Sequence, residues 1–113
     1  MLNEKPLVWS TLETVEGFKK VFASFPTSFT QLPCISFYEV FNGIASAADD
    51  DEYLSEIVFM VDLWGNPVDE LDELAIEVDA AMKGIGFIRE FSADVNDADS
   101  DVIHKTMRFK LLK

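Results

Sequence analysis

The side chains best suited to acid–base or nucleophilic chemistry are scarce in this sequence. It contains one histidine, His104, and one cysteine, Cys34. His104 stands among basic residues on the polar side of an alternating segment, and no serine or cysteine motif frames it. A general base needs a partner within hydrogen-bond reach, and the spacing provides none. Cys34 has apolar neighbours, which favours a structural thiol over a reactive one, and a single cysteine excludes an intramolecular disulfide. We therefore predict no enzyme activity and no catalytic residue.

The acidic segment near the C-terminus superficially resembles the start of a calcium-binding loop. Asp97, Asp99 and Asp101 alternate as the first ligands of such a loop would. The pattern then fails, because Val102 occupies the position of the turn glycine and Arg108 that of the bidentate glutamate. The other carboxylates lie in expected loops or on an expected helix surface, where solvation is usual. We predict no metal site and no cofactor, and only a weak surface cation stays open as an alternative.

Composition narrows the class of protein. The chain has 113 residues, which indicates one domain spanning residues 1–113, and 49% of them are hydrophobic, which excludes a wholly disordered chain. The net charge of -12 argues against specific nucleic-acid binding and against an anionic membrane surface. No apolar stretch approaches the roughly 20 residues of a membrane span, and the N-terminus does not resemble a signal peptide. These features favour synthesis in the cytosol, and either a basic protein partner or a surface past which DNA moves without binding.

The expected elements are arranged around the apolar run at residues 57–61. Hydrophobic periodicity predicts helices at 11–23 and 67–83 and strands at 34–41, 53–63, 87–91 and 101–112. Ser10 and Glu13 have the spacing of a capping box for the first helix, and Gly84 suits the C-terminal cap of the second. The acidic stretch within 44–52 is interpreted as a solvated loop. The resulting fold class is α+β, a mostly antiparallel four-stranded sheet with element order α-β-β-α-β-β and helices packed on it.

The central strand is apolar on both of its faces. One face carries Ile57, Phe59, Val61 and Leu63, and the other carries Val58, Met60 and Trp64. Because a helix covers only one face of a strand, we expect a further layer on the second face, from this chain or from a neighbouring subunit.

Charge is also distributed unevenly along the chain. Acidic residues concentrate on the second helix and in two loops, whereas four of the nine basic residues lie in the last strand and tail. A surface divided in this way can bind a second copy head to tail, although ordinary surface scatter is an alternative reading. Together with the second face of the central strand, this pattern predicts a subunit or partner interface with the following members: Val58, Met60, Trp64, Arg108, Lys110, Asp97 and Asp99.

Three stretches of the sequence resemble a known family. They are LPCISFYE at 32–39, EIVFMVDLWG at 56–65 leading through an acidic helix to AMKGIGF at 81–87, and NDADSD at 96–101 followed by VIHKTMRF at 102–109. In pattern and order they resemble the tail-completion, or tail-terminator, proteins of long-tailed bacteriophages and of prophages in Gram-positive bacteria. The resemblance covers most of the chain beyond about Phe25 and includes no catalytic motif.

The resemblance implies an α+β structural protein that forms a ring, usually a hexamer. Such a ring caps the head-proximal end of the tail tube, stops tube polymerisation and joins the tail to the head. Its partners would be other copies of itself, the tail tube protein and the head–tail connector protein. Its place would be the head–tail junction of the virion, and the host cytoplasm during assembly. Two alternatives stay open: a head-completion or connector protein of the same junction, and an acidic DNA mimic that inhibits a host nucleic-acid enzyme.

Overall fold

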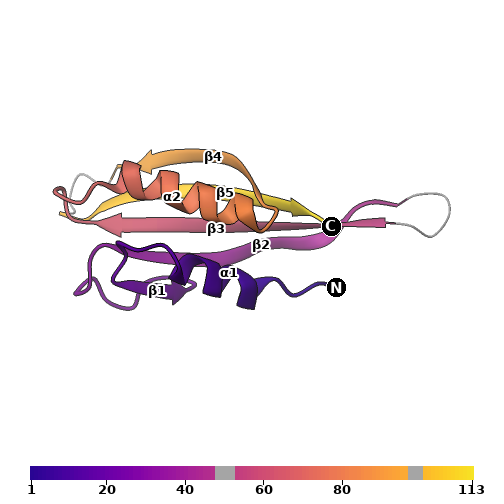
Figure 1. Ribbon diagram of the computed structural model, residues 1–113, viewed down its shortest axis with the longest axis horizontal. Helices are drawn as coiled ribbons and strands as arrows, with labels where there is room; N and C mark the ends of the chain where they lie inside the picture. Colours follow the sequence, from indigo (N-terminus) through magenta and orange to yellow (C-terminus); the bar gives the residue numbers. More distant parts are fainter. Residues whose placement is uncertain (48–52, 97–100) are drawn as a thin grey trace.

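The computed structural model describes residues 1–47, 53–96 and 101–113. It contains the following elements in chain order: α1 (Lys5–Glu13), β1 (Lys20–Ala23), β2 (Cys34–Ala47), β3 (Tyr53–Gly65), α2 (Leu71–Gly84), β4 (Ile88–Val95) and β5 (Ile103–Leu112). The strands form one mixed sheet in the order β1-β2-β3-β5-β4. Both helices lie on the same face of this sheet (Figure 1). The predicted four-stranded sheet with order α-β-β-α-β-β is therefore wrong, since the sheet has a fifth strand, β1, which pairs parallel to β2.

The error lies in the N-terminal segment, where a helix was expected over residues 11–23. Helix α1 begins earlier, with Pro6 in its first turn, and ends at Glu13. The Ser10 hydroxyl does not cap a helix but donates to the Leu7 carbonyl inside α1 at 3.1 Å. Gly17 has a φ of +119°, a conformation that side-chain-bearing residues rarely adopt and that redirects the chain into β1. The apolar residues beyond Gly17 still reach the core, but as a strand.

The β2–β3 hairpin is longer than expected. The strand predicted at 34–41 continues to Ala47, so that Asn42 and Gly43 lie within β2 and do not form a turn. Bulges between Glu39 and Phe41 and between Ile44 and Ser46 interrupt the alternation of apolar and polar residues. The sequence therefore shows no clear strand pattern beyond Phe41. The hairpin extends past the end of β5, and the molecule is elongated, 53 × 27 × 24 Å (Figure 1). The acidic run at 49–52 lies outside the described residues.

Helix α2 has the predicted apolar stripe but different ends. It begins at Leu71 rather than at Pro67, because residues 66–69 form a turn in which the Asn66 N–H donates to Asp69 Oδ2 at 2.6 Å. Gly84 belongs to the helix, and the residue with positive φ is Gly86, at +96°. The stripe packs on the sheet through buried Leu71, Ala75, Val78 and Met82.

The last two strands pair antiparallel. The strand predicted at 87–91 begins at Ile88 and continues to Val95 as β4. Strand β5 also pairs antiparallel with the central strand β3. The candidate interface residues Asp97 and Asp99 lie outside the described part of the chain.

The hydrophobic core lies between the helices and one face of the sheet. The predicted inner row of β3, Ile57, Phe59, Val61 and Leu63, is completely buried. Phe59 is central to it, with its ring centroid 6.1 Å from that of Phe37 and 5.8 Å from that of Phe87. This layer fixes β3 and thereby positions the opposite face of the sheet.

Candidate functional site

The opposite face of the sheet, which we call the helix-free face, carries most of the residues predicted to form an interface. Alternation along β3 places Val58, Met60, Asp62 and Trp64 there. The strand register adds side chains from both neighbours of β3: Cys34, Ser36 and Tyr38 on β2, and His104, Thr106, Arg108 and Lys110 on β5. The sheet therefore brings five of the seven predicted interface residues onto one surface: Val58, Met60, Trp64, Arg108 and Lys110.

At one end of this face, four side chains form a connected polar and aromatic group. His104 Nε2 lies 2.7 Å from Asp62 Oδ1, and the imidazole ring stacks on the Trp64 indole with centroids 3.7 Å apart. The indole N–H of Trp64 donates to the hydroxyl of buried Ser36 at 3.1 Å. Asp62, only 4% exposed, thus has a hydrogen-bond partner, as a buried carboxylate requires.

This group contains the residue types of a hydrolytic triad but not its connections. The Ser36 hydroxyl accepts from Trp64, and His104 Nε2 contacts Asp62 instead of Ser36, so the imidazole is not placed to take a proton from the hydroxyl. Within residues 1–47, 53–96 and 101–113, no group of three His, Cys, Asp or Glu side chains could hold a metal ion. The arrangement is suited to fixing the Trp64 and His104 rings against the sheet.

Part of the helix-free face is covered by the chain's own loop between β1 and β2. The Phe25 ring lies 5.4 Å from the Tyr38 ring, and the Phe29 ring lies 5.3 Å from the Trp64 ring, centroid to centroid. Both phenylalanines remain about half exposed, at 58% and 45%. The loop is thus a partial second layer over one end of the sheet and leaves the rest of the face without a covering element among the described residues.

Exposure differs among the predicted apolar interface residues. Val58 is only 2% exposed, because Phe41 and Lys110 flank it in the neighbouring strands. Met60 and Trp64 are half-buried. The larger exposed apolar side chains of this face lie nearer its margins: Phe41, Leu54, Ile88, Phe91, Val95 and Leu112, each at least 41% exposed. Val58 therefore offers little surface to a partner.

The predicted basic interface residues have carboxylate partners within the same chain. Arg108 Nε lies 3.0 Å from Glu90 Oε1, and Lys110 Nζ lies 2.7 Å from Glu56 Oε1. The hydrogen bond to Glu56 raises the pKa of Lys110 above its ordinary value. Arg108 and Lys110 are therefore paired inside the subunit, and these two cations are not free to attract a neighbour.

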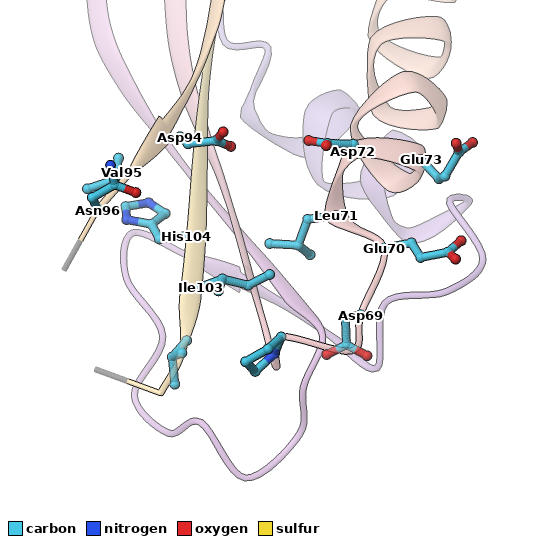
Figure 2. Close-up of a pocket in the computed structure, with 12 residues that line it drawn as sticks. Asp69, Glu70, Leu71, Asp72, Glu73, Asp94, Val95, Asn96, Ile103 and His104 are labelled. Atoms are coloured by element: carbon cyan, nitrogen blue, oxygen red, sulfur yellow. The ribbon is translucent and has the colours of Figure 1, made fainter. Parts of the chain in front are cut away.

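An open acidic pocket of about 940 Å³ lies where the start of α2 meets the end of β4 and the start of β5. Figure 2 shows the carboxylates of Asp72 and Asp94 directed toward each other, with Leu71 and Ile103 between α2 and β5. Lys105 Nζ bridges these two carboxylates at 2.9 Å each, which raises the pKa of Lys105 through the bond to Asp94 first and then the bond to Asp72. One lysine thus links the helix to the edge strand across the pocket.

Neither the Asp62–His104 pair nor the contact of Phe29 with Trp64 was predicted from the sequence. A signal for the pair existed: Asp62 interrupts an apolar strand, and His104 is the only histidine. Joining them required the register between β3 and β5, which places Trp64 opposite His104. No local signal indicated that Phe29 would contact Trp64, because the two residues are joined only by tertiary structure.

Comparison with known proteins adds no family. The chain matches no protein-family model, and the search of curated proteins finds no relative for it. In the described ranges, neither helix is long and apolar enough to cross a membrane.

Proposed function

We propose that this protein is a ring-forming tail-completion protein of a long-tailed bacteriophage or prophage. In that role it caps the head-proximal end of the tail tube, stops tube polymerisation and joins the tail to the head. The proposal combines the resemblance of three sequence stretches with a fold that presents several surfaces for protein contact.

The observation that carries the proposal is the open construction of the sheet. Its outer strands, β1 and β4, each pair on one side only among the described strands. The β2–β3 hairpin, with strands of 14 and 13 residues, reaches beyond the body of the molecule (Figure 1). Exposed apolar residues occur where β2 nears its end and β3 begins, such as Ile44 at 63% and Leu54 at 46%. Unpaired strands and exposed apolar side chains are typical of subunits that associate.

The direct test is tube capping. Purified protein is added to polymerising tail tube protein, and tube lengths are measured by negative-stain electron microscopy. The proposal expects shorter tubes with extra density at one end, and an oligomer of about six copies at that end. Tubes of unchanged length with bare ends, at concentrations well above that of the tube protein, would contradict it.

A head-completion or connector protein of the same junction is the nearest alternative. It would have the same kind of association surfaces but a different first partner. Co-purification separates the two roles, because a tail-completion protein is recovered with headless tails and a connector component with filled heads. Recovery with heads alone would replace the main proposal.

An acidic DNA mimic is the alternative from another class, and the acidic surface of α2 is the observation that favours it. Glu70, Asp72, Glu73 and Glu77 are all exposed there. Such a protein would bind a basic DNA-handling enzyme with an affinity that falls steeply with salt. Absence of binding to host nucleases and polymerases at low salt would remove this alternative.

A further inference from the structure

We propose that neighbouring copies join through the two outer strands of the sheet, with Lys19 and Lys20 at the β1 edge of one copy docking at the acidic pocket beside β4 of the next. This inference rests on the proposed ring and names its interface. It goes beyond the interface predicted from the sequence, whose basic members are already paired within the subunit.

The sheet geometry makes the two edges compatible. Strand β1 runs parallel to β2, β2 runs antiparallel to β3, and two further antiparallel pairings lead through β5 to β4. Between β1 and β4 there are one parallel and three antiparallel pairings, so β4 and β1 run in opposite directions. If successive copies keep the same orientation, β4 of one copy therefore meets β1 of the next as an antiparallel pair, which two short edge strands can form.

The charged groups also lie at matching heights on the two edges. The register connects Lys20 to Cys34, Cys34 to Trp64, Trp64 to His104 and His104 to Val95, so that Lys20 and Val95 end the same row of the sheet. Asp94 precedes Val95, and Lys19 precedes Lys20. Joining two copies along this row places Lys20 of one copy beside Val95 of the other, at the margin of the acidic pocket.

The basic side of this contact is not neutralised by carboxylates of its own subunit among the described residues. Lys19 and Lys20 are both exposed, and neither has a carboxylate within ion-pair distance among the described residues. The Lys20 ammonium lies over the Phe22 ring, 5.8 Å from its centroid. Arg89, Lys105, Arg108, Lys110 and Lys113, in contrast, each contact at least one carboxylate.

The other side carries an excess of negative charge over an apolar floor. The pocket contains five carboxylates, those of Asp69, Glu70, Asp72, Glu73 and Asp94, but in the part of the chain that the structure describes only Lys105 forms ion pairs with any of them. Leu71, Val95 and Ile103 supply apolar surface in the same pocket. Further along β4, Ile88 is 71% exposed and Phe91 is 42% exposed. A partner that adds a strand here would cover apolar side chains as well as gain ion pairs.

A second copy of this chain fits better than a generally basic protein, because it supplies a strand of the required direction with two free lysines at the required row. The net charge of -12 would oppose association over long distances. At physiological salt, however, charges more than about 8 Å apart are largely screened, so the local pairing of lysine with carboxylate outweighs the overall repulsion.

The experiment uses two charge-reversed versions of the full chain. One carries Lys19→Glu and Lys20→Glu, and the other carries Glu70→Lys and Asp94→Lys. Association is measured by analytical ultracentrifugation and by native mass spectrometry, with and without tail tubes. Each variant alone should associate at least about tenfold more weakly than the unmodified chain, because the attraction between lysines and carboxylates is then lost at every contact. Circular dichroism checks that both variants are folded.

The decisive measurement is the mixture of the two variants. In an equimolar mixture, the acidic β1 edge of one variant faces the two new lysines in the pocket of the other, and the unmodified β1 edge of the second variant faces the unmodified pocket of the first. Association should therefore return and produce rings in which the variants alternate. Lys83→Glu reverses another exposed lysine, near the end of α2, and should leave association unchanged.

Three outcomes would overturn the interface. They are unchanged association of either variant, failure of the mixture to recover, and a strict monomer of the unmodified chain on tubes as well as in solution. The first two leave tube capping by the unmodified chain intact, so they reject this interface without rejecting the proposed function. Absence of capping by the unmodified chain rejects the function itself.

Discussion

The two faces of β3 differ in how their side chains are buried. On the face toward the helices, Ile57, Phe59, Val61 and Leu63 are completely buried in an apolar layer. On the helix-free face, Val58 is covered by its neighbours in the sheet, and Asp62 is buried through its contact with His104. The first face holds the fold together through contacts with α1 and α2. The second is stabilised within the sheet itself and by one loop.

This difference explains how a strand that is apolar on both sides can exist in a two-layer protein. Dispersion and the hydrophobic effect act on the inner face, where aromatic rings interlock. On the helix-free face, which we also call the outer face, a hydrogen bond, an aromatic stack and long charged side chains cover the apolar atoms. The inner face, which the helices cover, should therefore govern the stability of the fold. The outer face and the edges of the sheet should govern association between copies.

The largest expected effect is that of Phe59→Ala. Phe59 is 0% exposed and packs between Phe37 and Phe87, so truncation leaves a cavity in the centre of the core. We expect the free energy of unfolding in urea to fall by about 3–5 kcal/mol. Met60→Ala, on the opposite face of the same strand, is the control and should cost less, because Met60 is half-buried. Equal losses for the two variants would contradict the proposed division between the faces.

The Asp62–His104 pair should give the next largest effect. Asp62→Ala removes the carboxylate that contacts His104 Nε2, and we expect a loss of about 1–3 kcal/mol in unfolding free energy, since a half-buried polar group loses its partner. Asp79→Ala breaks the exposed pair with Arg89 and should cost less than about 1 kcal/mol.

A double-mutant cycle with His104→Ala checks the assignment of this pair. Because the two side chains touch, the double variant should lose less stability than the sum of the single losses, by at least about 0.5 kcal/mol. Strict additivity would show that Asp62 and His104 contribute to stability independently, so their contact would not stabilise the outer face.

The sequence predicts those parts of the fold that depend on local periodicity. The stripe of α2 and the inner face of β3 are visible as helical and strand periodicity, and both were correctly assigned to buried surfaces. Segment 11–23 was not, because Leu12, Val15 and Phe18 have helical spacing although the chain leaves the helix after Glu13. The apolar spacing correctly indicates that these residues face the core. It does not indicate that the chain changes direction at Gly17, whose φ is positive.

The candidate site depends on pairings between distant strands, and the sequence shows these only in part. Lys105 interrupts the apolar row of the last strand, and in the structure it lies between Asp72 on α2 and Asp94 on β4. Its two partners are 33 and 11 positions away along the chain, so no local spacing could identify both. The same reason applies to Lys19 and Lys20, since their lack of a partner is a property of the tertiary structure.

The third prediction concerns the loop that covers part of the outer face. Phe29 is 45% exposed and contacts the Trp64 ring, so Phe29→Ala should cost only about 1 kcal/mol of stability. Its clearer effect should be on the exposure of Trp64. In a Trp9→Phe background, where Trp64 is the only tryptophan, acrylamide should quench its fluorescence more efficiently once Phe29 is removed. Phe25→Ala is the matched control, because Phe25 contacts Tyr38 instead of Trp64.

The smallest expected effect tests burial at Cys34, which lies on the outer face yet is 0% exposed. Burial raises the pKa of the Cys34 thiol from 9.0 to about 11. The folded protein therefore holds the thiol proton more tightly than the unfolded chain does. This contribution to stability is complete below about pH 9 and is lost as the pH rises toward the folded pKa. Between about pH 8 and about pH 9.5, we expect the free energy of unfolding to fall by less than about 1 kcal/mol from this group.

The Cys34→Ala variant isolates that contribution, because it removes the titrating thiol from both states. Urea unfolding of the two proteins at each pH should show a smaller decrease for the variant. Thiol labelling gives an independent measurement: a disulfide reagent should modify Cys34 slowly in the folded chain at neutral pH and rapidly in urea. Rapid labelling of the folded chain would mean that the outer face opens readily at Cys34, and the sheet and its loop would then protect this face far less than the helices protect the other.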